Sequence, residues 1–474
     1  MMSKRIDRFL ALLIVSGLAF AGVFLRHSLS AAAPQQASVA KSNARNAAIV
    51  AATTEVLKET SEIRELAVLR PVKSGAQSRS EIERMLIKNL NEQMTAAQMH
   101  ATELSLRKFG LAPDNFEYRP FIIKLLTEQV AGYYDPKTQE FHLADWLDLE
   151  GQKPVMAHEL THALQDQHFN LRRFEKWPHG DSDAELAAHA LVEGDATLAM
   201  TIYMAKNPLV ALAFSRSLTT GVATEQYDQA PRAMRESLIF PYLQGSEWAT
   251  QLYRRGGWTM VSNAFTKLPL SSEQILHAEK YFKYERPVKI VLPDVTNLLN
   301  AGSKQQPAIS NQHSSRRRLP TAHSPQPTAS AWHRIDSDVN GEWTYYLIID
   351  QFLKSPAESK RAAAGWGGDR YALYEGPNGQ VFLAQVAAWD TENDAREFFA
   401  AYVKRTELRY PGAKRLDPAD ANDETRSAKL ETRDSYSWQT GEGEVVIEFR
   451  GLRVVILEGV PDGVDASALM KALW

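Results

Sequence analysis

The sequence predicts an α+β protein, with a mostly helical first part that contains a small sheet and a C-terminal unit built on an antiparallel sheet. Two observations predict this class. Apolar residues recur every three or four positions through most of 42–282, which is the period of an α-helix. After residue 338, short runs rich in β-branched and aromatic residues alternate with glycine-containing turns and helical stretches, which is typical of an antiparallel sheet with helices on one face.

Composition limits the possible functions. The chain has 474 residues, which is enough for two domains or more, and its 44% hydrophobic and 23% charged residues are ordinary for a globular protein. A formal net charge of -3 gives no indication of a nucleic-acid partner, and we expect none. The absence of cysteine excludes disulfides, thiolate metal sites and a cysteine nucleophile.

Residues 1–33 have the composition of an export signal. Lys4, Arg5 and Arg8 precede the apolar, uncharged run Phe9–Leu25, and small residues follow it. This is the three-part order of a secretory signal peptide. The run is long for a signal core, so an uncleaved membrane anchor is the alternative. In both cases the remainder crosses the membrane, and we expect a periplasmic, extracellular or N-terminally anchored protein.

The first helices and a hairpin are predicted next. Residues 42–110 have helical periodicity, and Ser78 followed by Glu81 predicts a capping box at a helix start. A shorter helix is expected over 120–130. Two short β-runs on either side of Asp135-Pro136-Lys137-Thr138 predict a hairpin.

Two long helices follow the hairpin. The first should begin near Pro154, because proline is favoured at the first helical position, and should end near Gln167. The second should begin near Ser182 and extend past Met200. It should end at Asn207-Pro208, because proline cannot continue a helix.

A change of composition divides the chain. Helical sequence continues to about residue 282, with a break at Gly256-Gly257. Residues 301–337 are rich in Pro, Ser, Gln and Asn, which indicates a disordered linker. The linker separates a domain of residues 34–300 from a domain of residues 338–474.

No catalytic constellation is recognisable in the C-terminal domain, which we expect to cap the first domain or to bind a substrate or partner. Its predicted helices cover 341–353, 391–408 and the chain end, and its predicted strands cover 371–374, 381–387, 435–438, 444–449 and 453–457.

The chemistry is concentrated in His158-Glu159-Leu160-Thr161-His162. Two histidines four positions apart lie on one face of a helix, one turn apart, so both imidazoles can reach one ion. Imidazole suits zinc. Glu159 would project toward the open coordination position, where a carboxylate can take a proton from the attacking water. The alternative is a helix with two incidental histidines.

A catalytic zinc normally has three protein ligands, and His168 is the first candidate for the third. It lies ten positions after His158, which is the metzincin spacing. That arrangement requires a glycine three residues after the second histidine, and Gln165 stands there. We therefore expect His168 to be a helix-end residue instead.

The other two candidates, Glu185 and Glu193, lie on the next helix. Glu185 has a competing role, since Ser182-Asp183-Ala184-Glu185 has the pattern of a capping box. Glu193 lies in mid-helix among apolar residues, where a buried carboxylate needs a partner such as a metal. We predict that His158, His162 and Glu193 are the metal ligands.

The motif followed by Val192-Glu193-Gly194-Asp195-Ala196 resembles the gluzincin pattern of thermolysin-like peptidases and zinc aminopeptidases, in which a downstream helix supplies the glutamate. In the aminopeptidases a glycine follows it, as Gly194 does here. His162 and Glu193 are 31 positions apart, which is longer than in either group. The chain looks closer to a poorly characterised set of bacterial proteins assigned as metallopeptidases. The likeness covers roughly 121–370 and is carried by Gly132-Tyr133-Tyr134-Asp135-Pro136, His162-Ala163-Leu164-Gln165-Asp166-Gln167, Glu193-Gly194-Asp195-Ala196, Phe240-Pro241-Tyr242, Ser272-Glu273-Gln274-Ile275-Leu276-His277 and Gly365-Trp366-Gly367-Gly368-Asp369-Arg370.

This resemblance implies a zincin-like metallopeptidase domain that binds Zn²⁺ and a peptide or protein substrate, with Glu159 as general base. It also implies a tyrosine or histidine that donates to the developing oxyanion. We prefer His277, because it follows a predicted capping box at Ser271–Gln274 and so stands at a defined helix turn. The other candidates are Tyr133, Tyr134, Tyr242 and His189.

Supporting roles can be assigned by position. Zinc-bound histidines usually donate their second N–H to a carboxylate or carbonyl, and Asp195 and Asp166 are candidates, although we expect Asp166 to be exposed. The resemblance further implies that a strand before the motif helix pairs with the substrate through its free edge, and Phe141–Ala144 is the expected edge. Whether the residues before Ser78 form an inhibitory pro-segment is left open.

These expectations describe an exported zinc-dependent peptidase. The alternative is a catalytically inactive, metal-stabilised scaffold or binding protein of the cell envelope. Glu159 argues against that alternative, because a structural zinc site closes its fourth position and needs no such carboxylate. A hydrolase that acts on another bond with the same water chemistry is a third possibility.

Overall fold

The computed structural model describes residues 35–176, 180–220, 225–303, 331–416 and 434–474. The chain forms two units, one from the described parts of Met1–Thr102 and Asn115–Glu285, the other from Glu103–Asp114 and the described parts of Arg286–Trp474. The first is mostly helical with a three-stranded sheet, and the second contains a seven-stranded sheet. The predicted α+β class is confirmed.

The helical part of the first unit begins with α1 (Gln35–Arg64) and α2 (Arg79–Gln93). The predicted capping box is present, since Glu81 accepts from the backbone N–H of Ser78 at 2.7 Å. The remaining helices are α3 (Ala96–Lys108), whose last residues belong to the second unit, α4 (Tyr118–Gln129), α5 (Leu149–Phe169), α6 (Ser182–Lys206), α7 (Pro208–Thr220), α8 (Glu225–Gln229), α9 (Arg232–Ala264), α10 (Ser272–Leu276) and α11 (Ala278–Lys283).

The small sheet has the order β1-β3-β2. Strands β2 (Gly132–Asp135) and β3 (Glu140–Ala144) form the predicted hairpin. Strand β1 (Lys73–Gln77) pairs in parallel with the other side of β3, within a stretch predicted to be helical. The expectation that Phe141–Ala144 is the free edge is therefore wrong, because both sides of β3 are paired. The edge beside the motif helix is β2.

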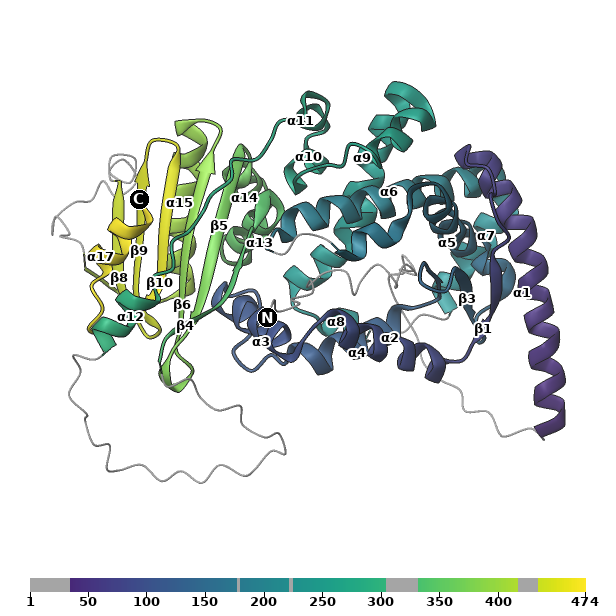
Figure 1. Ribbon diagram of the computed structural model, residues 1–474, viewed down its shortest axis with the longest axis horizontal. Helices are drawn as coiled ribbons and strands as arrows, with labels where there is room; N and C mark the ends of the chain where they lie inside the picture. The colour runs from purple at the N-terminus through teal and green to yellow at the C-terminus, as the bar shows by residue number, and fades with distance from the viewer. Residues whose placement is uncertain (1–34, 177–179, 221–224, 304–330, 417–433) are drawn as a thin grey trace. The chain divides into compact units, whose positions relative to one another are not determined.

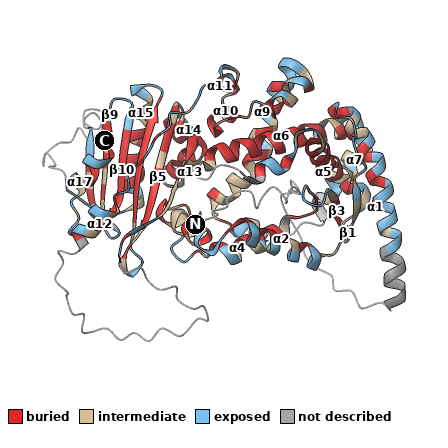
Figure 2. Cartoon of the chain, in the orientation of Figure 1, coloured by how far each residue is buried: buried red, intermediate tan, exposed pale blue. Residues whose placement is uncertain are grey.

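Helix α5 carries the motif and begins earlier than predicted. Asp148 caps it by accepting from the backbone N–H of Gly151 at 2.8 Å, so Pro154 lies inside the helix and not at its start. Helix α6 ends at Lys206 and α7 begins at Pro208, as expected. Helix α6 packs against both α5 and α9, and Figure 2 shows that α5 and α6 are buried along most of their length.

Helix α9 is interrupted at the predicted glycine pair. Gly257 has a φ of 62°, in the left-handed region that glycine adopts without steric cost. Among the residues that the structure describes, no single helix is both long and apolar enough to cross a membrane. The pair α6 and α7, which is bent by 115°, passes that test only when the two helices are joined. Residues 1–33, with the expected signal, lie outside the described residues.

The sheet of the second unit is antiparallel throughout. Its order is β4 (His333–Asp338), β5 (Trp366–Glu375), β6 (Val381–Trp389), β10 (Arg453–Val460), β9 (Gly443–Arg450), β8 (Ser435–Thr440) and β7 (Lys414–Arg415). Helices α13 (Gly341–Leu353), α14 (Pro356–Ala363) and α15 (Glu392–Arg409) cover one face (Figure 1).

The other face is covered by α12 (Thr296–Ser303) and α17 (Ala466–Leu473), which pack on alternate residues of β5, β6 and β10. Helices thus lie on both faces, and not on one as expected. Residues 286–300 belong to this unit, although the sequence grouped them with the first domain. Strand β4 begins inside the predicted linker, of which residues 304–330 lie outside the described part.

Candidate metal centre

The two motif histidines lie together on the buried face of α5. His158 and His162 are 5% and 4% exposed, and their Nε2 atoms are 3.1 Å apart. Their spacing of four residues places one ring a turn above the other. Both rings therefore direct the same nitrogen to one point, as the sequence predicted.

Glu193 reaches that point from α6. Its Oε2 atom lies 3.0 Å from His158 Nε2 and 3.3 Å from His162 Nε2. The three side chains form a buried group that could hold a metal ion. An ion bound at about 2.0–2.1 Å by donors in tetrahedral arrangement spaces those donors roughly 3.3 Å apart. The donor types and their spacing therefore fit such an ion.

The two alternative third ligands lie outside this group. His168 is in the last turn of α5, where its Nε2 is 2.7 Å from the carbonyl oxygen of Ala67. Glu185 is in the first turn of α6, but the helix is capped by Asp181 and not by a box at Ser182. Asp181 accepts from the backbone N–H of Ala184 at 3.1 Å.

Glu159 is fully buried next to His158, and its side chain is hydrogen-bonded to the small sheet. Its Oε2 accepts the backbone N–H of Tyr134 on β2 at 2.9 Å. The carbonyl oxygens of Ala131 and Asp135 accept from the hairpin partner, and bonding alternates along a strand, so the N–H of Tyr134 points away from β3. The free edge of β2 therefore faces the carboxylate that was predicted to be the base.

Charge within the cluster is strongly coupled. Burial alone would raise the pKa of Glu193, but the two imidazoles, His162 above all, outweigh it and lower that pKa far below its usual value. Burial would likewise lower the pKa of His162, but the Glu193 carboxylate raises it to about 9. For His158 burial dominates and lowers the pKa. The cluster thus combines an anionic carboxylate with a neutral His158 and a protonated His162, whose proton on the ligand nitrogen a divalent cation would displace.

Tyr242 on α9 contacts two of the three predicted ligands. Its ring stacks on the His158 imidazole, with centroids 5.9 Å apart and an interplanar angle of 27°. Burial, followed by the nearby carboxylates of Glu193 and Glu159 and a hydrogen bond to Glu193, raises the pKa of Tyr242 well above its usual value. The phenol therefore remains a proton donor at neutral pH.

The other predicted oxyanion donors have different surroundings. Tyr133 donates to Gln77 at 2.8 Å, and Tyr134 donates to Asp166 at 3.0 Å. His189 is buried on α6, and burial lowers its pKa to about 4, so its ring is neutral. His277 lies between α10 and α11, with Nδ1 4.0 Å from Glu279, and its proposed role stays a prediction.

Asp166 is buried, which corrects the expectation that it is exposed. Its carboxylate accepts from Tyr134 Oη, from Arg70 and from the backbone N–H of Leu171. These bonds connect the motif helix to β2 and to the segment before β1. Asp166 therefore has a structural role at the end of α5.

Sequence reasoning missed two residues behind the ligands, Gln165 and Arg64, and it placed Asp195 one contact too close to the histidines. Gln165 contacts His162 Nδ1 at 2.9 Å, and Asp195 contacts Gln165 and Arg64, so Asp195 does not act directly on a histidine. In the sequence, Gln165 was used only to argue against the metzincin arrangement, which requires a glycine at that position. Its position three residues after His162 on the same helix face was the available signal.

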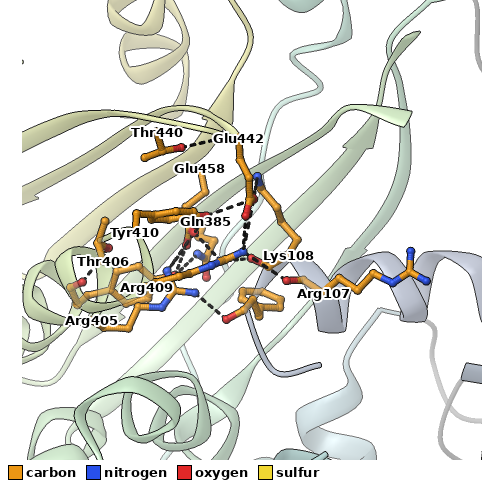
Figure 3. A network of polar contacts seen from close by, with 12 residues as sticks. Arg107, Lys108, Gln385, Arg405, Thr406, Arg409, Tyr410, Thr440, Glu442 and Glu458 are labelled. Carbon is orange, nitrogen blue, oxygen red and sulfur yellow. Dashed lines mark hydrogen bonds and ion pairs between the residues drawn. The ribbon is translucent and has the colours of Figure 1, made fainter. Parts of the chain in front are cut away.

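The second unit contains a buried network of polar contacts (Figure 3). Glu458 on β10 and Arg405 on α15 are both fully buried and share two hydrogen bonds of 3.0 Å. Arg409 and Tyr402 also bond to Glu458. Burial would raise the pKa of Glu458, but the two arginines lower it to about 2.

The same network anchors the short segment 103–114 within this unit. Lys108 pairs with Glu442 at 2.8 Å, and Arg405 donates to the carbonyl oxygen of Phe109 at 2.6 Å. Because the buried charges have partners of opposite sign, we interpret this network as structural.

Comparison with known proteins bears only on the second unit. A family model described as a domain of unknown function (DUF8575) matches residues 328–470, which is less than a third of the chain. No curated protein and no solved structure matched.

Proposed function

We propose that this chain is an exported zinc-dependent peptidase that hydrolyses peptide bonds with a metal-activated water. The observation that carries the proposal is the convergence of His158 Nε2, His162 Nε2 and Glu193 Oε2 within 3.0–3.3 Å of one another, beside the buried Glu159. These three side chains would hold the ion. When bound, zinc would polarise the scissile carbonyl and lower the pKa of the attacking water.

Glu159 is proposed as the general base. Its carboxylate takes a proton from the attacking water and passes it to the leaving amine. The N–H of Tyr134 fixes one oxygen of this carboxylate at 2.9 Å, so the base is held in one orientation by the edge strand. Orientation of this kind contributes to rate because the reacting groups need no further alignment.

Tyr242 is proposed as the donor to the developing oxyanion. It contacts His158 and Glu193, and its raised pKa keeps the hydroxyl proton in place. Such a donor acts in the transition state, in which the carbonyl oxygen gains charge. We assign this role to Tyr242 ahead of His277, because Tyr242 contacts the ligands.

The free edge of β2 is proposed to bind the substrate backbone. An extended peptide can add to an exposed strand edge through main-chain hydrogen bonds. Tyr134 gives its own N–H to Glu159, so a chain paired along β2 would use other backbone groups of this edge and would lie next to the base. This arrangement favours a peptide or protein substrate over a small molecule.

The test compares wild type with Glu159→Gln, using an unfolded protein as substrate, with and without a chelator. We expect cleavage by the zinc-loaded wild type, loss of cleavage in the chelator, and no cleavage by Glu159→Gln although the variant retains its metal. Equal cleavage by wild type and Glu159→Gln would overturn the assignment of the base. One metal per chain without cleavage of any peptide would favour the inactive scaffold of the cell envelope.

The metal itself needs a direct measurement. Two histidines and one carboxylate also suit iron(II) in other proteins, so the donor set does not select zinc alone. Elemental analysis of the purified full chain should give about one zinc per chain, as expected for a single three-ligand site. A stoichiometric content of another metal would contradict the assignment of zinc, but it would still support a metal site formed by His158, His162 and Glu193.

A further inference from the structure

The orientation of the Gln165 side chain is determined by its surroundings. The residue is fully buried on α5. Its amide nitrogen donates to the carbonyl oxygen of Val192 at 3.0 Å and to Oδ2 of Asp195 at 2.8 Å. Both partners are acceptors, so the nitrogen must face them and both of its hydrogens are used. The amide oxygen must then face the opposite direction, toward His162.

This orientation fixes the proton on the His162 ring. Gln165 Oε1 lies 2.9 Å from His162 Nδ1, and an amide oxygen can only accept. Nδ1 therefore carries a hydrogen and donates it. The opposite nitrogen, Nε2, is the one directed at His158 and Glu193, so it is the nitrogen that can bind a metal when the ring is neutral.

Asp195 is held in turn by the end of α1. Arg64 Nε donates to Asp195 Oδ1 at 2.5 Å, and both side chains are fully buried. The other guanidinium nitrogens bond to Ser262 Oγ at 3.1 and 3.2 Å, and the group lies 4.5 Å over the Trp258 ring. Helix α1 is thus built into the first unit, which argues against α1 being a removable pro-segment.

We propose that Gln165 is a positioning residue that sets the tautomer of His162, and that Asp195 and Arg64 hold Gln165 in place. The inference rests on the proposed function, because it assigns His162 to a metal. Partners of this kind contribute about 10- to 100-fold to metal affinity in known sites. This series of hydrogen bonds from His162 through Gln165 and Asp195 to Arg64 also connects helix α1 to the metal centre.

The test measures zinc affinity of the folded full chain by competition with a chelator. Gln165→Met, which removes the acceptor, should bind zinc about 10- to 100-fold more weakly. The double variant Gln165→Glu/Asp195→Asn keeps an oxygen for Nδ1–H and replaces the facing Asp195 acceptor by a donor, so it should recover most of that loss. Gln167→Met is the matched control, since Gln167 bonds only to the backbone of Leu69 and Arg70 in the contacts described and should leave zinc affinity unchanged.

A second measurement needs no variant. Nitrogen-15 NMR of histidine-labelled wild type should show the neutral His162 ring protonated at Nδ1 and not at Nε2, both with zinc bound and without zinc once the second proton has been removed at high pH. A His162 ring without a proton on Nδ1, or equal zinc affinity of Gln165→Met and wild type, would overturn the inference. If wild type binds no zinc while the neutral His162 ring carries its proton on Nδ1, the proposed function fails and the role of Gln165 in fixing the tautomer stands.

Discussion

Gly194 on α6 and Gly245 on α9 approach so closely that a Cβ atom at Gly194 would lie 2.2 Å from the carbonyl carbon and oxygen of Gly245. A Cβ at Gly245 would in turn lie 2.3 Å from the carbonyl oxygen of Ala190. The atoms that the added Cβ would meet belong to the backbone, which cannot move aside as the end of a flexible side chain can. Because α6 carries Glu193 and α9 carries Tyr242, this contact sets the distance between a predicted ligand and the proposed oxyanion donor.

Gly194→Ala should therefore disturb both the fold and the site. The added methyl group must push α9 away from α6, and overpacking of this kind costs about 1–3 kcal/mol or more. We expect a lower melting temperature and, in the folded fraction, reduced peptide cleavage. Gly441→Ala is the control, because a Cβ there meets nothing within 4 Å. Identical melting and cleavage for Gly194→Ala and wild type would show that the close contact is not required.

Tyr242→Phe, assayed at saturating zinc because it also loses the hydrogen bond to Glu193, should reduce kcat by about 10²–10³, the usual cost of losing one oxyanion donor, with little change in KM. Only the hydroxyl is removed, so stacking on His158 remains. Steady-state kinetics measure these quantities. Tyr133→Phe is the control, since that hydroxyl donates to Gln77 on β1. A kcat equal to that of wild type would exclude Tyr242 as the donor and return the role to His277.

Local patterns in the sequence predicted the elements that depend on local chemistry. The hairpin around Asp135, the break at Pro208 and the paired faces of His158 and His162 all follow from spacing and residue type. Glu193 was found from a burial argument, since a carboxylate amid apolar residues needs a partner.

What could not be predicted depends on contacts between distant segments. Strand β1 has the sequence Lys73-Ser74-Gly75-Ala76-Gln77, which has no alternating apolar pattern, and it is a strand because it pairs with β3. Arg64 reaches the site from α1, and no local motif marks it; Tyr242 was a candidate, but only the packing of α9 against α6 distinguishes it from the other candidates. The predicted start of α5 at Pro154 was wrong, because Asp148 caps the helix and α5 begins at Leu149.

In the second unit, Arg405→Met should destabilise the protein by about 3–5 kcal/mol, because it leaves the buried Glu458 carboxylate without its main partner. The double variant Arg405→Met/Glu458→Met should be less destabilised than the sum of the two single variants. Denaturant unfolding gives these free energies. Lys404→Ala, next along α15, breaks an exposed pair with Glu358 and should cost about 1 kcal/mol or less. Additive effects of Arg405→Met and Glu458→Met would refute a direct coupling.

The most direct test of the metal centre is zinc binding by wild type, Glu193→Ala and Glu185→Ala, measured by calorimetry on the folded full chain. Glu193 contributes the oxygen that lies 3.0 Å and 3.3 Å from the two histidine nitrogens, whereas Glu185 lies outside the three-residue group. We predict one zinc per chain for wild type and for Glu185→Ala, and a large loss of affinity for Glu193→Ala. Undiminished binding by Glu193→Ala, or no binding by wild type, would contradict a zinc site formed by His158, His162 and Glu193.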